Sequence, residues 1–287
     1  MKKKDFLPFL LLVSAFFIGI YILFPQIRSG LKIISPQELA QKYQEIVTPT
    51  PTPTPRPLTF AELNELYGPC VNLPTLMYHH IQDKDQAEER NQLALTVETE
   101  TFKNQMGYLK AKGYRTAGMD ELIAFFDQGS PVAKGSILLT FDDGYDDFSK
   151  NALPILEELG LKATIFISTG LMDNPGYLTW EEISEATPSA YLFANHTWSH
   201  KNMQTTKEKI EFEISTADSQ LAERGLNSSK VFAYPYGLIS DYAKEYLEKI
   251  EYKLAFGTRS GSTLCKKQRF ELPRVRIGNT SLSVYGF

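Results

Sequence analysis

The sequence predicts an α/β fold, namely a barrel of about seven parallel strands that is preceded by one transmembrane helix and a Pro/Thr linker. Short apolar, β-rich segments alternate with helical patterns from residue 73 to residue 277. Such alternation is typical of a parallel sheet covered by helices, and about seven repeats suffice to close the sheet. In addition, polar residues follow several of the strands, as they do at the carboxyl-terminal rim of such barrels.

The composition is that of an ordinary globular protein. The chain has 287 residues, a formal net charge of −4, 43% hydrophobic residues and 22% charged residues. These values exclude a chain that is disordered throughout, a collagen-like repeat and a multi-span membrane protein. The weakly acidic charge gives no reason to expect a nucleic-acid partner. We expect one large domain with appendages, acting as a monomer.

The amino-terminal residues predict a membrane anchor at residues 6–25, behind a cytoplasmic tail of residues 1–5. Three lysines precede an uncharged apolar stretch from Phe6 to Phe24, which ends at Pro25. At about 1.5 Å per residue the stretch is close to the thickness of a hydrocarbon core, about 30 Å, and the lysines indicate a cytoplasmic amino terminus. A cleaved signal peptide is the alternative, but its apolar region is usually shorter and ends in small residues.

A linker is expected at residues 26–57. Its last ten residues, 48–57, have proline at every second position, a pattern that favours a semi-rigid polyproline II spacer. The folded domain should begin between Leu58 and Val71, and we assign it to residues 71–287. With the anchor, this organisation predicts a single-pass cell-membrane protein whose domain lies outside the cytoplasm.

The predicted elements of the domain follow one another in strand–helix order. Seven strands are expected, at Leu73–Tyr78, Ser136–Phe141, Ala163–Ser168, Tyr191–Asn195, Val231–Tyr234, Lys253–Phe256 and Arg274–Ile277. Six helices are expected, at Thr101–Lys112, Met119–Gln128, Asp146–Leu159, Trp180–Ala186, Lys207–Arg224 and Ser240–Ile250. In the first helix, for example, Phe102, Met106 and Leu109 recur at helical spacing before Gly113 ends it.

All four histidines and an adjacent pair of carboxylates follow predicted strands. The first strand is followed by His79 and His80, the second by Asp142 and Asp143, and the fourth by His196 and His200. Because the carboxyl ends of parallel barrel strands share one rim, we expect these side chains to lie close together.

Two histidines four residues apart, with a carboxylate from another strand, are typical ligands of a catalytic metal. Three protein ligands leave a coordination position open. Imidazole and carboxylate suit Zn²⁺, with Co²⁺ or Ni²⁺ as alternatives. Adjacent residues on a strand point in opposite directions, so one of Asp142 and Asp143 should be a ligand and the other a base. Taken alone, this Asp-Asp-Gly segment would indicate only a turn.

Two motifs resemble those of the polysaccharide deacetylase (NodB-homology) family of carbohydrate esterases. They are Thr140-Phe-Asp-Asp-Gly144 and His196-Thr-Trp-Ser-His200, and the similarity extends over roughly residues 74–277. The resemblance implies a distorted (β/α) barrel that removes acetyl groups from N-acetylglucosamine polymers with a divalent metal. It also implies Asp142 as the general base, and Asp143, His196 and His200 as the metal ligands.

The segment Phe232–Gly237 is similar to the family's third motif, in which a backbone N–H, here that of Tyr236, helps to form an oxyanion hole. One residue departs from the pattern. Ala233 stands where the family usually has an arginine that holds the catalytic base. We expect Arg274 or Arg276, on the last strand, to replace it.

The family's usual general acid, a histidine in a late Leu-x-x-His motif, is missing as well. The early segment Leu76–Ile81 is similar instead to the branch that deacetylates poly-β-1,6-N-acetylglucosamine, where a histidine after the first strand is the acid. The similarity implies His79 as the acid and His80 as a neighbour with an orienting or structural role. The alternative is that both are strand-end histidines whose hydrogen bonds are satisfied within the fold.

The two cysteines, Cys70 and Cys265, stand at the two ends of the domain. Outside the cytoplasm they can form a disulfide that would join the first strand to the last. Two free thiols are the alternative.

These observations predict a membrane-anchored, metal-dependent N-deacetylase that acts on cell-wall polysaccharide or exopolysaccharide. Two other functions remain open. Ala233 argues for a catalytically impaired glycan-binding module of the same fold, whereas the intact acid, base and three ligands argue against it. An amidase acting on small cyclic amides is disfavoured by the anchor and stalk, because a soluble metabolite requires neither.

Overall fold

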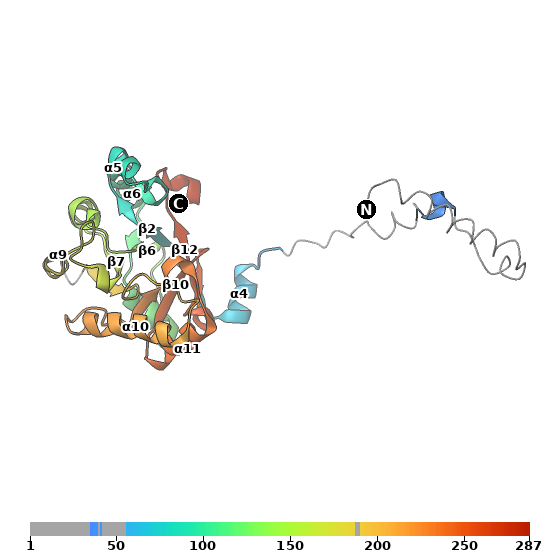
Figure 1. Ribbon diagram of the computed structural model, residues 1–287. Helices are drawn as coiled ribbons and strands as arrows, with labels where there is room; N and C mark the ends of the chain where they lie inside the picture. The colour runs from blue at the N-terminus through green and yellow to red at the C-terminus, as the bar shows by residue number, and fades with distance from the viewer. Residues whose placement is uncertain (1–34, 40, 42–55, 187–189) are drawn as a thin grey trace, which may run out of the picture. The chain divides into compact units, whose positions relative to one another are not determined.

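Seven parallel strands close into a barrel in the computed structural model of this protein (Figure 1). The structure describes residues 35–39, 41, 56–186 and 190–287. Around the ring the strands are β2 (Thr75–Tyr78), β12 (Leu272–Arg276), β10 (Leu254–Ser260), β9 (Val231–Ala233), β8 (Tyr191–Asn195), β7 (Ala163–Ile167) and β6 (Ser136–Phe141). The ring closes where β6 pairs with β2, with Tyr78 opposite Phe141. The predicted parallel barrel is therefore confirmed.

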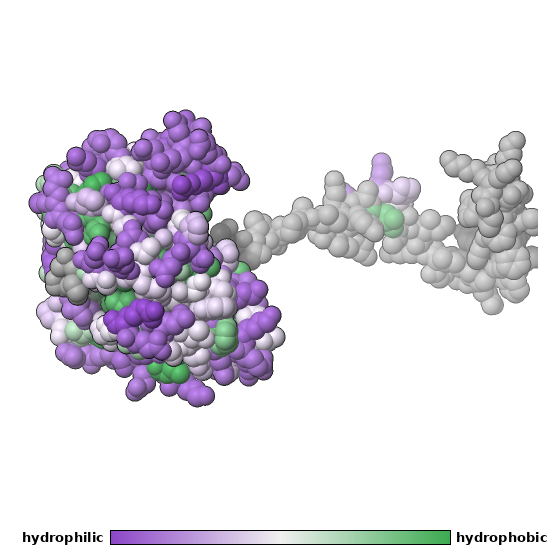
Figure 2. All heavy atoms as spheres, turned by 60° about the vertical axis from the view of Figure 1, so that its left-hand side comes forward, coloured by the Kyte–Doolittle hydropathy of each residue, from purple (hydrophilic) through white to green (hydrophobic). Residues whose placement is uncertain are grey.

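The helices lie outside the barrel and follow the predicted order. They are α6 (Thr99–Ala111), α7 (Met119–Gln128), α8 (Leu153–Leu159), α9 (Trp180–Glu185), α10 (Lys207–Ala222) and α11 (Asp241–Lys249). The side chain of Thr179 caps the start of α9, and Gly129 ends α7 in the left-handed conformation, with φ of 73°. The face of the molecule in Figure 2 is mainly hydrophilic, with small separate hydrophobic areas, as expected where helices turn polar sides to solvent.

One predicted helix is irregular. The segment expected as a single helix from Asp146 to Leu159 begins with a π-helical turn, η2 (Phe148–Ala152), before α8. Pro154, in the first turn of α8, has no N–H to donate to the preceding turn. This missing donor lies where π-helical hydrogen bonding gives way to the α-helical pattern, which begins at Leu153.

Several short elements were not predicted. The strands are β1 (Cys70–Asn72), β3 (His80–Ile81), β4 (Thr96–Val97), β5 (Arg115–Thr116) and β11 (Thr263–Cys265). The helices are α4 (Phe60–Tyr67), α5 (Lys84–Glu89), η1 (Leu93–Leu95), η3 (Thr169–Leu171), η4 (Pro235–Gly237), η5 (Lys266–Gln268) and η6 (Leu282–Tyr285). β5 pairs with the start of β6, β3 pairs with β4, and β1 pairs antiparallel with β11.

Cys70 and Cys265 face each other across the β1–β11 pair, and a disulfide joins them with an S–S distance of 2.05 Å. The chain divides into two units, Met1–Pro57 and Leu58–Phe287, and the barrel belongs to the second. The predicted tail, the predicted anchor at residues 6–25 and most of the predicted linker lie outside the described residues. Within the described part, no helix combines the length and the apolarity that crossing a membrane requires.

The core has a layer on each side of the barrel wall. Outside the wall, Leu76 and Tyr78 of β2 pack in one buried cluster with Phe102 and Met106 of α6. A second cluster joins residues from six of the seven strands, among them Phe166 of β7, as the filled interior of a small barrel requires. The guanidinium of Arg274 lies 5.6 Å from the centre of the Phe166 ring. One aromatic ring of this interior layer therefore lies close to a buried charge.

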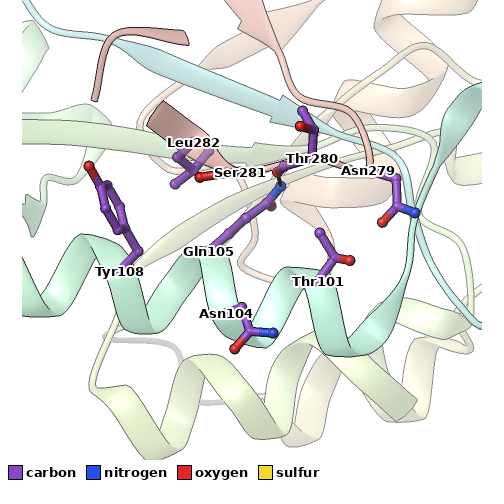
Figure 3. Close-up of a pocket in the computed structure, with 8 residues that line it drawn as sticks. All are labelled: Thr101, Asn104, Gln105, Tyr108, Asn279, Thr280, Ser281 and Leu282. Atoms are coloured by element: carbon purple, nitrogen blue, oxygen red, sulfur yellow. Dashed lines mark hydrogen bonds between the residues drawn. The ribbon is translucent and has the colours of Figure 1, made fainter. Parts of the chain in front are cut away.

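The carboxyl-terminal segment packs on α6. Gln105 donates a hydrogen bond to the carbonyl oxygen of Gly278 at 3.1 Å. It donates another to the carbonyl oxygen of Thr280 at 2.6 Å (Figure 3). Its side-chain oxygen accepts from the hydroxyl of Tyr78 at 3.0 Å. These bonds fix the last residues of the chain against the helix that follows β4.

Candidate active site

The carboxyl ends of neighbouring strands deliver the candidate residues to one rim. Asp142 directly follows β6, and its N–H donates to the carbonyl oxygen of Tyr78 at 3.0 Å. His196 directly follows β8, and its N–H donates to the carbonyl oxygen of Ile167 at 3.0 Å. The sheet ladder thus continues past the strand ends, which fixes the first polar residue of each loop.

Asp143, His196 and His200 form one cluster whose ligand atoms all lie within 4.8 Å of one another. One oxygen of Asp143 lies 3.2 Å from Nε2 of His196 and 3.0 Å from Nε2 of His200. Among the described residues, this is the only group of three or more potential ligands that could hold a metal ion. The structure therefore brings together the three residues that the sequence analysis assigned as ligands.

The chain makes a left-handed turn at Asp143 and Gly144, directly after Asp142. Asp143 and Gly144 have φ angles of 76° and 74°, a conformation that glycine adopts without strain. A Cβ atom on Gly144 would meet the side chain of Ile167 at 2.9 Å and that of Met172 at 3.0 Å. The turn therefore depends on glycine, and it directs Asp143 toward the histidines, while Asp142 lies directly after the end of β6.

The hydrogen bonds of His196 fix its tautomer. Nδ1 lies 2.7 Å from the carbonyl oxygen of Ala233, and a carbonyl oxygen only accepts, so Nδ1 carries the hydrogen. In neutral His196, Nε2 would then direct a lone pair at the Asp143 carboxylate. The lone pair and the carboxylate oxygen repel each other, so a cation is needed between them. Without a metal, the cation is a proton. Burial opposes the protonation of His196, but the hydrogen bond to Asp143 and the charges of Asp142 and Asp143 raise its pKa.

The pKa of Asp143 also agrees with a cation between this carboxylate and the histidines. Burial favours its neutral form, but hydrogen bonds from His196 and His200 hold its pKa well below the usual range. An ionised carboxylate and two imidazole Nε2 atoms that converge on one point are donors that suit Zn²⁺, Co²⁺ or Ni²⁺. The residues present therefore fit a divalent metal.

Asp142 forms a buried ion pair with Arg274. Two guanidinium nitrogens of Arg274 donate to the two carboxylate oxygens of Asp142, at 2.7 and 2.6 Å. The same guanidinium donates to the Gly257 carbonyl at 2.9 Å and to the Thr140 hydroxyl at 3.2 Å. Burial alone would raise the pKa of Asp142, but the charge and hydrogen bonds of Arg274 lower it.

Arg274 is therefore the basic partner of Asp142, the contact that the sequence analysis expected from an arginine of the last strand because of Ala233. Of the two arginines suggested by the sequence, Arg276 lies elsewhere, because its guanidinium donates to the carbonyl of Ala94 at 3.2 Å. The spacing of residues along the sequence does not reveal which arginine of another strand pairs with Asp142. That assignment requires knowledge of which strands are neighbours in the ring.

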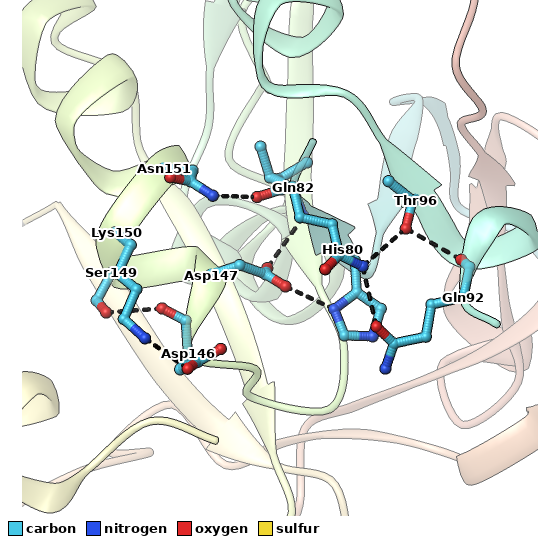
Figure 4. Close-up of polar contacts among 10 residues, drawn as sticks. His80, Gln82, Gln92, Thr96, Asp146, Asp147, Ser149, Lys150 and Asn151 are labelled. Carbon is cyan, nitrogen blue, oxygen red and sulfur yellow. Dashed lines mark hydrogen bonds and ion pairs between the residues drawn. The ribbon is translucent and has the colours of Figure 1, made fainter. Parts of the chain in front are cut away.

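The two neighbouring histidines have different environments. The pKa of His79 is lowered by burial, while the charges of Asp142 and Asp143 oppose that shift. His79 therefore belongs electrostatically to the same cluster. His80 is 2% exposed, and its Nδ1 lies 2.5 Å from an oxygen of Asp147 (Figure 4). His80 is thus held away from that cluster by a partner of its own.

Tyr236 lies beside the predicted ligands. Its backbone is left-handed, with φ of 60° and ψ of 3°, which is unusual for a bulky residue. Its side chain is 65% exposed, and its ring centre lies 4.6 Å from that of His200. In the next residue, Gly237, a Cβ atom would meet the Thr258 hydroxyl at 2.0 Å. The loop after β9 is therefore a constrained turn next to the metal-ligand cluster.

Sequence reasoning missed two residues near the site, Tyr145 and Asp147. Tyr145 follows the predicted ligand Asp143 by two residues, and its ring stacks on that of His80. Asp147 accepts hydrogen bonds from the Ile81 N–H, and its other oxygen contacts His80. The sequence signal for these two residues was weak, because Asp147 lies in the segment expected to begin an ordinary helix and Tyr145 directly precedes that segment.

Comparisons with known proteins agree with this geometry. Residues 129–255 match a family model described as polysaccharide deacetylase. Bacillus subtilis YxkH, whose name describes a polysaccharide deacetylase, is 27% identical over 206 residues, which are 71% of each chain. The Escherichia coli poly-beta-1,6-N-acetyl-D-glucosamine N-deacetylase is 24% identical over 248 residues, 71% of this chain but 36% of that protein.

The fold is also similar to that of a deacetylase of known structure. The Streptococcus pyogenes deacetylase PplD, in complex with acetate, superposes with a TM-score of 0.69 and 29% sequence identity. The match covers 74% of this chain and 96% of that one.

Proposed function

Because the chain belongs to the polysaccharide deacetylase family, we propose that it is a metal-dependent hydrolase that removes N-acetyl groups from N-acetylglucosamine-containing polysaccharide. One observation carries the proposal. A single rim places a carboxylate held by an arginine, Asp142, next to three side chains that converge on one point. A base beside a Lewis acid is an arrangement that can catalyse the hydrolysis of an acetamide.

The metal is the first part of the mechanism. Asp143, His196 and His200 would hold a divalent cation, with Zn²⁺ the first choice and Co²⁺ or Ni²⁺ as alternatives. When bound, the cation would supply a Lewis acid that polarises the acetamide carbonyl.

Asp142 is the proposed general base, which takes a proton from the attacking water. Its ion pair with Arg274 keeps the carboxylate charged and fixes both of its oxygens. As the water oxygen adds to the acetyl carbon, the carbonyl oxygen becomes negative. We propose that the backbone N–H of Tyr236 donates a hydrogen bond to this oxygen, and stabilisation of that kind is commonly a large catalytic contribution.

His79 is the proposed general acid, which donates a proton to the leaving amine. The lowered pKa of His79 makes its imidazolium a stronger acid, because burial disfavours the charged form. The same shift decreases the protonated fraction at neutral pH. Activity should therefore depend on pH in the range where this histidine titrates.

The substrate is proposed to be cell-wall polysaccharide or exopolysaccharide. Poly-β-1,6-N-acetylglucosamine is the first polymer to test, because it appears in the name of the Escherichia coli relative. The main argument for a catalytically impaired glycan-binding module was Ala233. The pairing of Arg274 with Asp142 removes that argument, so catalysis is the better proposal.

The proposed location is outside the cytoplasm, with residues 6–25 as the membrane anchor. The disulfide between Cys70 and Cys265 supports an oxidising compartment. An extracytoplasmic domain on a stalk can reach a polymer outside the membrane.

Product analysis tests the function directly. The purified chain should release acetate from defined oligomers of β-1,6-linked N-acetylglucosamine, stop when a chelator removes the metal, and recover when Zn²⁺ is restored. Peptidoglycan fragments should be assayed in parallel to distinguish the two substrate classes. Acetate release that is unaffected by chelation would contradict the metal-dependent mechanism, and release from neither polymer would contradict the proposed substrate class.

A further inference from the structure

The loop from His196 to His200 carries two of the three proposed ligands, and its backbone is strained at two residues. Thr197 and His200 have φ angles of 72° and 59°, in the left-handed region that residues other than glycine rarely adopt. A strained conformation of this kind persists only where the surrounding structure holds it firmly. The contacts of the loop are therefore what keeps its two histidines in place.

The two histidine rings are held in different ways. Nδ1 of His196 lies 2.7 Å from the carbonyl oxygen of Ala233. Among the described residues, Nδ1 of His200 has no hydrogen-bond partner, and the ring packs beside that of Tyr236, with ring centres 4.6 Å apart. A metal-binding histidine is usually oriented by a hydrogen bond at its second ring nitrogen. The orientation of His200 therefore depends more on how its backbone is held.

Glu213 of α10 binds the loop directly before His200. The two oxygens of its carboxylate accept hydrogen bonds from the Ser199 N–H at 2.8 Å and from the Ser199 hydroxyl at 2.6 Å. Its backbone carbonyl oxygen accepts from the Trp198 N–H at 3.0 Å. One helical residue thus fixes two consecutive N–H groups of the loop.

Glu213 is a charged residue on the buried face of α10. Ile210, Ile214 and Ala217 share that face at helical spacing, and Glu213 itself is only 6% exposed. Burying a carboxylate is costly unless its oxygens are hydrogen-bonded, so an apolar side chain would serve the packing better. An ionised carboxylate offers acceptors and no donor, which is what the N–H and the hydroxyl of Ser199 require. The loop, rather than the core, therefore explains a carboxylate at this position.

We propose that Glu213 is a positioning residue for His200, because its hold on Ser199 keeps the His200 imidazole directed at the point where Asp143 and His196 converge. The inference rests on the proposed function, since His200 is a proposed metal ligand. Partners that orient a ligand typically contribute about 10- to 100-fold to metal affinity. Glu213 needs to touch neither the metal nor the substrate.

Glu213→Ala removes both side-chain acceptors, and Glu213→Gln is the conservative variant. The Zn²⁺ affinity of the full chain, measured by competition with a chromophoric chelator, should fall by about 10- to 100-fold in Glu213→Ala. Glu213→Gln should recover most of this loss, because its amide oxygen can accept from the Ser199 N–H and its amide nitrogen can donate to the Ser199 hydroxyl oxygen. An affinity in Glu213→Gln as low as in Glu213→Ala would overturn positioning by hydrogen bonds.

The coordination geometry gives a second measurement. The visible absorption spectrum of the chain loaded with Co²⁺ reports the arrangement of the ligands around the metal. It should change in Glu213→Ala, because the His200 ring is no longer held in one orientation, and it should be restored in Glu213→Gln. An unchanged spectrum in Glu213→Ala would contradict the proposal.

Glu182→Ala is the matched control for a general loss of stability. Glu182 also accepts from a serine hydroxyl and from a backbone N–H, those of Ser149 at 2.7 Å and Thr179 at 2.8 Å, but it does so at the start of α9. Both alanine variants should have a lower Tm, and only Glu213→Ala should bind Zn²⁺ more weakly. An equal loss of affinity in Glu182→Ala would mean that affinity follows stability, and the positioning role would be wrong.

Ser199→Ala tests whether Glu213 acts through Ser199. This variant removes the hydroxyl and keeps the backbone N–H, so its loss of Zn²⁺ affinity should be smaller than that of Glu213→Ala. The double variant should bind Zn²⁺ no more weakly than Glu213→Ala alone, because both changes affect one contact and coupled residues are not additive. Additive losses would overturn the link between Glu213 and Ser199.

The outcomes separate the inference from the function on which it rests. If the unchanged chain binds no Zn²⁺ and works without metal, the proposed metal-dependent function fails, and the positioning role fails with it. If the unchanged chain binds Zn²⁺ and deacetylates its substrate while Glu213→Ala binds Zn²⁺ equally well, only the positioning role is overturned.

Discussion

Arg274 and Asp142 meet inside the barrel mouth, where two guanidinium nitrogens lie 2.7 and 2.6 Å from the two carboxylate oxygens. The two side chains come from β12 and from the end of β6, which are separated in the ring by β2. Both are almost wholly buried, with 0% and 4% of their side-chain surface exposed. Removing one partner of such a pair commonly costs about 3–5 kcal/mol, because the other charge remains buried.

Arg274→Gln should therefore change the pH dependence of catalysis as well as its rate. Without the guanidinium, burial dominates and the pKa of Asp142 rises. The proposed base is then protonated at higher pH, so the acidic limb of the kcat/KM profile should move to higher pH. Arg276→Gln is the matched control and should leave that limb in place. An unshifted limb in Arg274→Gln would show that Asp142 is not the titrating base.

Asp142→Asn and His200→Ala should separate base chemistry from metal binding. Asp142→Asn should lower kcat by about 10²–10⁴, the usual scale of positioned proton transfer, while bound Zn²⁺ is retained. His200→Ala removes one of three ligands, so metal and activity should be lost together. Elemental analysis of both variants after gel filtration measures the difference. Stoichiometric zinc in His200→Ala would contradict the ligand assignment.

His79→Ala should remove the alkaline limb of the profile. A general acid works only while protonated, so kcat/KM should fall as the pH rises through the pKa of His79. Since burial lowers that pKa, the fall should begin below the ordinary histidine value of 6.5. In His79→Ala the rate should be low and almost independent of pH in this range. Persistence of the same limb would exclude His79 and direct attention to another acid.

The barrel could be predicted because each strand and most helices carry their own local signal. Buried strands such as Ser136–Phe141 and amphipathic helices such as Met119–Gln128 have the predicted bounds. The site residues were expected to lie close together because the carboxyl ends of parallel barrel strands share one rim. That rule places Asp143, His196 and His200 on one rim but gives no distances.

The rest of the site depends on contacts between segments distant in sequence. Arg274 reaches Asp142 because β2 alone separates their strands in the closed ring, a fact that no local pattern contains. Likewise, the separate environments of His79 and His80 depend on Asp147, which lies 67 residues from His80. The π-helical turn before α8 also escaped prediction, since periodicity cannot distinguish it from the first turn of an α-helix.

Removing residues 1–57 should leave a soluble, active domain, because Leu58–Phe287 forms a unit with its own core. The full-length chain should remain in the membrane fraction, and its amino-terminal peptide should still contain Met1. Fractionation and mass spectrometry test both statements. A mature amino terminus between Phe24 and Ile34 would indicate a cleaved signal peptide instead of an anchor.

The bridge between Cys70 and Cys265 also determines how the domain would bear a mechanical load. A pull on the chain from its amino-terminal side passes through α4 and then reaches the bridge at Cys70, the first residue of β1. From Cys70 the force divides, passing along the chain to β2 and through the covalent bridge to β11, 195 residues later. Because β2 and β12 are paired and β11 precedes β12, the load would return to neighbouring strands of one ring. If the domain is tethered as proposed, a load on its amino-terminal side would thus be shared by two paired strands of the ring instead of separating β1 from the domain.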